Sequence, residues 1–238
     1  MDISVLGFNI HHGRGMDLRL DLDRIAAVIK KSSVDICGLH EVDRQFSLRS
    51  RFQDQAVVLA QRLDMNVVFG PAITRGEDSQ FGNALLSRYP ISDYHHHVIG
   101  SARKRTEDRS IIEATVDLGG VEVICFVTHF SLNRDLHQKQ VSFLTNRICV
   151  KEKPVIIIAD GNRRPQFSGW VPLTHYVYDV WSSRKNGATF PATFPLIRLD
   201  YLFVSEHFDI RTAEVVKANP IASDHLPVKA VLNLKKDG

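Results

Sequence analysis

Hydrophobic positions recur along this chain with two different periods, and the change of period predicts where strands and helices alternate. Short apolar runs predict strands at residues 3–8, 34–39, 66–69, 83–86, 91–98, 110–118, 121–130, 155–158, 199–204, 210–216 and 228–232. Apolar residues at helical spacing predict helices at 22–29, 56–63 and 135–149, with a short helix at 175–181. Gly119-Gly120 marks a hairpin. Many strands and few helices indicate two mixed sheets packed face to face with helices outside, a layered α/β sandwich.

Length and composition narrow the class of protein. The 238 residues show no break in composition, so we expect a single domain spanning 1–238. No apolar run approaches the roughly 20 residues that span a bilayer, and the start MDISVLGFNI lacks the features of a secretory signal. We therefore expect a cytoplasmic protein without a transmembrane segment, and we expect a monomer. Cys37, Cys125 and Cys149 lie in apolar contexts and are expected to be core thiols.

Polar side chains stand at or near the ends of six of the apolar runs. They are Asn9, Glu41, His129, Asp160 with Asn162, Asp200, and the pair Asp224-His225. Carboxylates, imidazoles and carboxamides delivered by several strands suggest one acidic pocket that suits a metal ion, which is typical of an enzyme. The net charge of +3 permits an anionic substrate but is far from the strongly basic surface of many nucleic-acid-binding proteins.

The order of these residues carries a family resemblance. The motifs are GFNIHHG, GLHEVD, VTHFS, IIADGN, RLDYLFVS and SDHLPV. Together they resemble the endonuclease/exonuclease/phosphatase superfamily, which includes DNase I-like nucleases, inositol polyphosphate 5-phosphatases and neutral sphingomyelinases. The resemblance covers residues 3–233 and implies a four-layer α/β sandwich and a metal-dependent phosphoric ester hydrolase.

The resemblance also implies a metal site. Glu41 is the first ligand it suggests, and Asn9 and Asp224 complete the protein's share of the ligands, with Asp224 acting directly or through water. The expected ion is Mg²⁺, which prefers carboxylate and carboxamide oxygens, and Mn²⁺ is a second option. From the residues alone, Asn9 could instead be a turn-forming amide, and Asp224-His225 a helix cap.

Catalytic roles follow from the same resemblance. His225 would be polarised by Asp200, Asp160 would orient the attacking water, and either His225 or Asp160 would take its proton. Asn162 would donate to the phosphoryl oxygens and His129 to a developing negative oxygen, although His129 could also be a core histidine.

Two further residues are candidates for substrate binding. Asn83 lies on a strand that resembles the family's site floor. Arg109 stands where some relatives present a phosphate-binding side chain, with a solvated surface arginine as the alternative.

The sequence departs from the family pattern at two places. Gly161 stands where relatives commonly have Phe, and we expect looser packing there. His11 stands where apurinic-type nucleases have an acid. A second carboxylate-bound metal is therefore not expected, but His11 could ligate a softer ion such as Mn²⁺.

The substrate is not specified by these motifs, because specificity in this family comes from loops around a shared centre. The leading expectation is a phosphodiesterase acting on a small or accessible phosphoester, with a lipid headgroup or nucleic acid also possible as the partner. The alternatives are an endo- or exonuclease on DNA or RNA, and a catalytically silent relative that only binds phosphorylated ligands.

Overall fold

Two six-stranded mixed sheets pack face to face in the computed structural model, which describes residues 1–100, 106–182 and 187–235. The first sheet has the order β11 (Phe208–Val215), β12 (Val228–Leu234), β1 (Asp2–Asn9), β2 (Ile36–Arg44), β4 (Ser79–Ser87) and β3 (Asn66–Arg75). The second has the order β5 (Ile91–Ile99), β6 (Arg109–Asp117), β7 (Glu122–His129), β8 (Val155–Asp160), β10 (Asp200–Val204) and β9 (Tyr178–Asp179).

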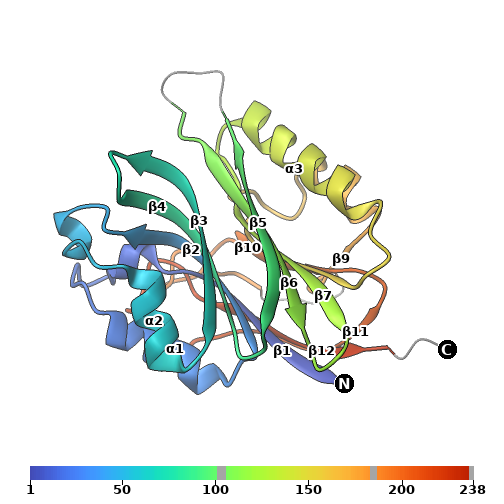
Figure 1. Cartoon of the computed structure of the whole chain (residues 1–238), viewed down its shortest axis with the longest axis horizontal. Helices are drawn as coiled ribbons and strands as arrows, with labels where there is room; N and C mark the ends of the chain where they lie inside the picture. The colour runs from blue at the N-terminus through green and yellow to red at the C-terminus, as the bar shows by residue number, and fades with distance from the viewer. Residues whose placement is uncertain (101–105, 183–186, 236–238) are drawn as a thin grey trace.

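Helices cover the outer faces of both sheets (Figure 1). Helices α1 (Leu22–Ser32) and α2 (Gln55–Leu63) pack on the first sheet, while α3 (Arg134–Ile148) and α4 (Val171–Thr174) pack on the second. The three long helices begin at Asp21, Asp54 and Asn133, whose side chains accept a backbone N–H of the first turn. Short 3-10 turns occupy η1 (His11–Gly13), η2 (Leu48–Ser50) and η3 (Ser168–Trp170). The expected four-layer α/β sandwich is confirmed.

Central strands such as β1 and β8 bury side chains on both faces, because the middle of each sheet is covered on both sides. In β1, Ile3 and Val5 point into the core between the sheets, whereas Leu6 and Phe8 pack under α1 and α2. This division follows the two-residue period of a strand.

Two glycines let the sheets approach closely below the site. A Cβ on Gly38 would lie 2.6 Å from Cγ2 of Ile158, and a Cβ on Gly7 would lie 2.9 Å from the same atom. Ile158 of the second sheet therefore fills the space that side chains of β1 and β2 would otherwise occupy.

The polar strand ends meet at one edge because of the strand directions. Strands β1 and β2 are parallel neighbours, as are β7 and β8, so each pair ends at a shared edge. His129 is in register with Asp160, and Asp200 at the start of antiparallel β10 is also in register with Asp160. The topology thus gathers residues that are distant in sequence.

Two local predictions were wrong. The short helix lies at Val171–Thr174 instead of 175–181, since Pro172 suits a first helical turn, and Tyr178–Asp179 forms a strand against β10. Cys37 and Cys125 are buried free thiols, as expected, but Cys149 is exposed just after α3.

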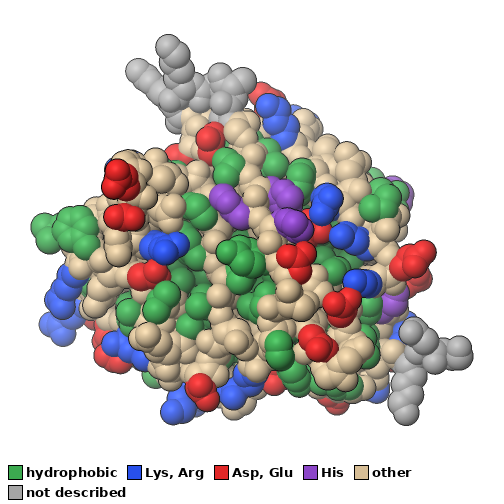
Figure 2. All heavy atoms as spheres, viewed as in Figure 1, with side chains coloured by type: hydrophobic (Ala, Val, Ile, Leu, Met, Phe, Trp, Pro, Cys, Tyr) green, Lys and Arg blue, Asp and Glu red, His purple; other side chains and the backbone are tan. Residues whose placement is uncertain are grey.

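The surface agrees with the mild net charge. On the face shown in Figure 2, acidic, basic and apolar side chains are interspersed, without one dominant patch. Among the described helices, none combines the length and apolar character that a bilayer span needs.

Candidate active site

Glu41 is turned toward the site by an irregularity in β2. The pairing of β2 with β4 shifts between Leu39 and Val42, and Glu41 inside this bulge has a left-handed φ of 58°. A bulge changes the direction of a side chain relative to the regular pleat. Glu41 is thereby left half-buried at the rim, while its neighbours in the strand remain in the core.

Asn9, at the end of β1, links the two sheets. Its amide nitrogen Nδ2 lies 2.9 Å from Oε1 of Glu41 and 2.8 Å from Oδ2 of Asp160, and its Oδ1 accepts the backbone N–H of His11 at 3.0 Å. The amide therefore presents N–H groups, and not its oxygen, to the two carboxylates. The Asn9 amide thus connects Glu41 to Asp160 and orients the Glu41 carboxylate.

His129, Asp160 and Asn162 form the part of the site supplied by β7 and β8. The Nδ2 of Asn162 donates to the Phe130 carbonyl at 2.9 Å and lies 2.7 Å from Nε2 of His129. Because Nδ2 can only donate, Nε2 accepts, so the proton of the neutral ring is on Nδ1. The same Nε2 is 3.5 Å from Oδ2 of Asp160.

His225 is held by Asp200. Nδ1 of His225 lies 2.9 Å from Oδ2 of Asp200, and its Nε2 is 3.8 Å from Oδ2 of Asp160. All three side chains are buried. This is the arrangement in which a carboxylate fixes the tautomer and orientation of an imidazole.

The buried charges shift one another's protonation. Burial by itself lowers the pKa of His225, but Asp200 and Asp160 outweigh it and place that pKa above its usual value. Burial raises the pKa of Asp160, but His129 and His225 outweigh this effect and lower it. At neutral pH this favours an ionised Asp160 beside a protonated His225.

Two further groups line the cavity: His129, an imidazole that is neutral, and Glu41, a carboxyl whose ionisation is opposed by burial. Burial lowers the pKa of His129 to about 3, so it is neutral at neutral pH. Burial raises the pKa of Glu41, and the N–H of Asn9 only partly offsets this. A cation near Glu41 would favour its ionised form.

A cavity of about 520 Å³ opens over these residues. Glu41 and His225, which approach from different sheets, both line it, together with His129, Asp160, Asn162 and Arg109. Nε of Arg109 is buried without a hydrogen-bond partner. The structure thus brings Arg109 to the cavity, as expected of a substrate-binding residue.

Four predicted residues are not part of the cavity wall: Asn9 and Asp200, which contact the wall residues Glu41 and His225, and also Asn83 and Asp224. Asn83 is buried in β4 and donates to the carbonyl and hydroxyl oxygens of Ser110 at 3.1 and 2.9 Å, so its amide ties the sheets together. Asp224 is half-buried at the rim, where its Oδ1 is 4.0 Å from Nδ1 of His11.

Sequence reasoning missed the outer wall of the cavity, which comes from the segment between β2 and α2 and from the adjoining ends of β3 and β4. Phe46 and Phe81 lie there with Arg49 and Arg75. Both guanidinium groups are 4.8 Å from the centre of the Phe46 ring, a cation–π distance, and Arg49 also pairs with buried Asp43. No local pattern marks these residues as a group, because the wall forms only when separate segments of the chain come together.

The packing beneath the Asp160–Asn162 turn is not loose, contrary to the expectation for Gly161. A Cβ there would lie 2.7 Å from the Tyr201 ring and 2.9 Å from the Trp170 ring. Trp170 fills space that the missing side chain leaves, so the glycine is required by its neighbours.

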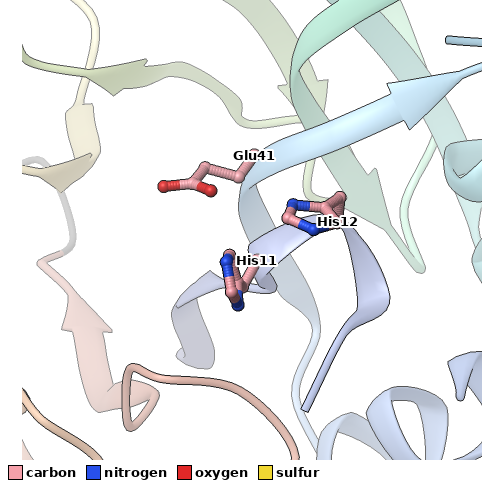
Figure 3. A group of neighbouring side chains, drawn as sticks. All are labelled: His11, His12 and Glu41. Carbon is pink, nitrogen blue, oxygen red and sulfur yellow. The ribbon is translucent and has the colours of Figure 1, made fainter. Parts of the chain in front are cut away.

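The residues of the site fit a divalent cation. Glu41, His11 and His12 each offer a ligand atom, and these atoms lie within 4.8 Å of one another (Figure 3). Nδ1 of His12 is buried without a hydrogen-bond partner. Glu41 and the rim carboxylate Asp224 supply the negative charge that such an ion requires.

A four-layer sandwich with polar strand ends around one cavity, lined by acidic, histidine and arginine side chains, defines the class of protein, and sequence comparison identifies the family. The family model for the C-terminal nuclease-like domain of PGAP2IP matches residues 2–168. The chain therefore belongs to this family, within the endonuclease/exonuclease/phosphatase superfamily.

Individual proteins agree with this assignment. The uncharacterized protein YbhP of Escherichia coli is 27% identical over 97% of this chain and 96% of its own length. Protein cwh43 of Schizosaccharomyces pombe is 33% identical over 73% of this chain, but over only 18% of its own length. A solved endonuclease/exonuclease/phosphatase from Beutenbergia cavernae superposes with a TM-score of 0.77 at 24% identity, over 98% of this chain and 72% of that one.

Proposed function

We propose that the protein is a metal-dependent phosphoesterase, and more specifically a phosphodiesterase that hydrolyses a P–O bond with an activated water. One observation carries the proposal: His225, which Asp200 holds at 2.9 Å, lines a single cavity together with Asp160 and Glu41. The superfamily membership supports the choice of phosphoester chemistry.

Each residue has a proposed role consistent with its contacts. Ionised Asp160 orients the attacking water and accepts its proton, since His225 already carries one. Protonated His225, which Asp200 holds in place, faces the phosphate as a charged hydrogen-bond donor, and Arg109 binds a non-bridging oxygen.

His129 completes the oxygen-binding side, and Asn162 orients it. The Asn162 amide donates to the Phe130 carbonyl and to Nε2 of His129, and the neutral His129 ring can present its Nδ1–H to an oxygen of the phosphate without adding charge. Glu41 and Asp224 would hold a divalent ion, Mg²⁺ in the simplest case. Bound there, such an ion neutralises charge on the phosphate and on the departing oxygen.

The test is hydrolysis of bis-p-nitrophenyl phosphate and of p-nitrophenyl phosphate by the purified protein with Mg²⁺, with Mn²⁺ and with chelator. We expect metal-dependent turnover with a preference for the diester. Turnover of the monoester alone would contradict the phosphodiesterase assignment. Absence of turnover with either ion would contradict the hydrolase, whether or not phosphate binds.

A panel of inositol phosphates, phospholipids and oligonucleotides then defines the substrate. Cleavage restricted to DNA or RNA, with binding that weakens steeply in salt, would assign the protein as a nuclease instead.

A further inference from the structure

Two adjacent histidines beside Glu41 have no role in the proposed mechanism. His11 and His12 follow β1 in η1, and both have left-handed backbone conformations, with φ of 45° and 46°. Figure 3 shows His11 and His12 on the turn after β1 and Glu41 on β2, with the three side chains gathered around one space. Their arrangement therefore depends on the turn and on the β2 bulge together.

His12 has the properties of a side chain that needs a ligand. Only 7% of it is exposed, and its Nδ1 has no hydrogen-bond partner. Its backbone carbonyl accepts Nε2 of Gln55 at 2.7 Å, which fixes the turn. A buried ring nitrogen without a partner costs free energy, so a ligand on Nδ1 would remove that cost.

The ring of His11 is held through one nitrogen, which leaves its other nitrogen available to a ligand. Its Nδ1 lies 3.2 Å from the Arg14 carbonyl, which can only accept a hydrogen bond. In the neutral ring Nδ1 then carries the proton and Nε2 keeps its lone pair, as in many metal-ligating histidines. Nδ1 of His11 is also 4.0 Å from Oδ1 of Asp224, which places a second carboxylate next to the ring.

The ligand atoms of His11, His12 and Glu41 lie within 4.8 Å of one another. In a tetrahedral site the ligand atoms, each about 2.1 Å from the ion, lie about 3.4 Å apart, so side-chain shifts of about 1 Å would let all three reach it. The expected oxygen ligand, Asn9, presents its N–H to Glu41 instead. The set around Glu41 is therefore rich in imidazole nitrogen.

We propose that His11, His12 and Glu41 bind a transition-metal ion of the Mn²⁺ to Zn²⁺ series in preference to Mg²⁺. Imidazole suits Zn²⁺ and Co²⁺, whereas Mg²⁺ requires oxygen ligands in octahedral geometry. The catalytic meaning of this ion rests on the proposed function, but its binding is measurable without turnover.

The experiment titrates Co²⁺ into the metal-free full-length protein and follows its visible absorption, with Zn²⁺ and Mg²⁺ as competitors. We expect one Co²⁺ per chain with an absorption typical of nitrogen ligation. Zn²⁺ should displace it, whereas Mg²⁺ should need at least about 100-fold higher concentration. Displacement by Mg²⁺ at a concentration equal to that of Zn²⁺ would overturn the proposal.

Three variants assign the ligands. His11→Ala and His12→Ala should each weaken Co²⁺ binding at least about 10-fold and leave the weak Mg²⁺ binding within about 2-fold, while His175→Ala, at an exposed histidine after α4, should bind Co²⁺ as the wild type does. Wild-type Co²⁺ affinity in His11→Ala and in folded His12→Ala would refute the site. If circular dichroism shows that His12→Ala is not folded, the Co²⁺ affinity of His11→Ala decides the outcome, because His11 is only half-buried.

Turnover assays separate this inference from the proposed function. A histidine-dependent Co²⁺ site in a protein that hydrolyses no phosphoester with any ion supports the site and contradicts the phosphoesterase. The opposite result is turnover with Mg²⁺ together with Co²⁺ binding that neither histidine variant changes. That result supports the phosphoesterase and contradicts the proposed metal site.

Discussion

Two groups of titratable side chains share the candidate active site, and they differ in how their polar atoms are satisfied. Asp160, Asp200 and His225 form a linked group, in which Nδ1 of His225 lies 2.9 Å from Oδ2 of Asp200 and its Nε2 lies 3.8 Å from Oδ2 of Asp160. His11, His12 and Glu41 approach within 4.8 Å of one another, but the described structure records no hydrogen bond between them.

The difference indicates that the two groups of side chains have different roles. Hydrogen bonds between fixed partners set the charge and orientation of a group before the substrate arrives, which suits proton chemistry. Ligand atoms that converge without hydrogen bonds to one another suit a cation that binds from solution. Removing a member of the linked group should therefore impair turnover and leave metal binding intact.

The largest effect is expected from His225→Ala. The variant loses the positive group that Asp200 holds toward the cavity, so kcat should fall at least about 100-fold. Steady-state kinetics measures the loss, and Co²⁺ titration of the same variant should give wild-type affinity. A parallel loss of Co²⁺ binding would show that the two groups are not separable.

Asp200→Asn should have the next largest effect, because it removes the charge of the partner and preserves its shape. We expect kcat to fall about 10- to 100-fold, as for other partners that orient a functional histidine. The pKa of His225 should fall as well, since Asp200 is a main cause of its increase. NMR titration of the metal-free protein measures this shift, and an unchanged His225 pKa would contradict the assigned link.

Gly161→Ala tests whether the linked group depends on the packing below it. The added methyl meets the Tyr201 and Trp170 rings, so we expect about 1–3 kcal/mol lower stability and a reduced kcat. Denaturant unfolding measures the change. Gly100→Ala is the control, because a Cβ there makes only an ordinary 3.7 Å contact with Asp108.

Glu113 offers a smaller test of the same principle, away from the site. Burial would raise its pKa, but hydrogen bonds from Lys151 and Arg147, at 3.0 and 2.9 Å, lower it below the ordinary value. Its ionised form therefore stabilises the fold fully above about pH 5, and this contribution is lost as pH falls through the lowered pKa.

Glu113→Gln should lower stability by about 1–2 kcal/mol at pH 7 and have a smaller effect below pH 4 or so. Denaturant unfolding across this pH range measures the difference. An equal loss at both pH values would indicate that shape, and not charge, matters at this position.

Much of the framework could be predicted from the sequence, because buried strands leave a clear period in the chain. The runs ending near Asn9, His129 and Asp160 fall where β1, β7 and β8 end, and one shared edge follows from strand direction. Hydrophobic periodicity gives no information about which way a carboxamide is rotated, so the N–H groups that Asn9 presents to Glu41 could not be anticipated.

Other parts of the site depend on contacts that no local pattern contains. His12 becomes a buried ring with a free nitrogen only because Gln55, in α2, holds its carbonyl. Phe46 and Arg75 meet at the cavity wall although they come from separate segments. Asn83 has a suitable residue type, but packing between the sheets occupies its amide.

The close approach of the two sheets at Gly7 and Gly38 fixes the distance between the sheets. The geometry of the candidate active site depends on that distance. Asn9 comes from one sheet and Asp160 from the other, and only 2.8 Å separates their polar atoms. A methyl group added around Ile158, deep in the hydrocarbon interior, would wedge the layers apart and stretch that bridge. Inactivating changes in this protein should therefore arise at purely apolar positions as well as among the charged residues.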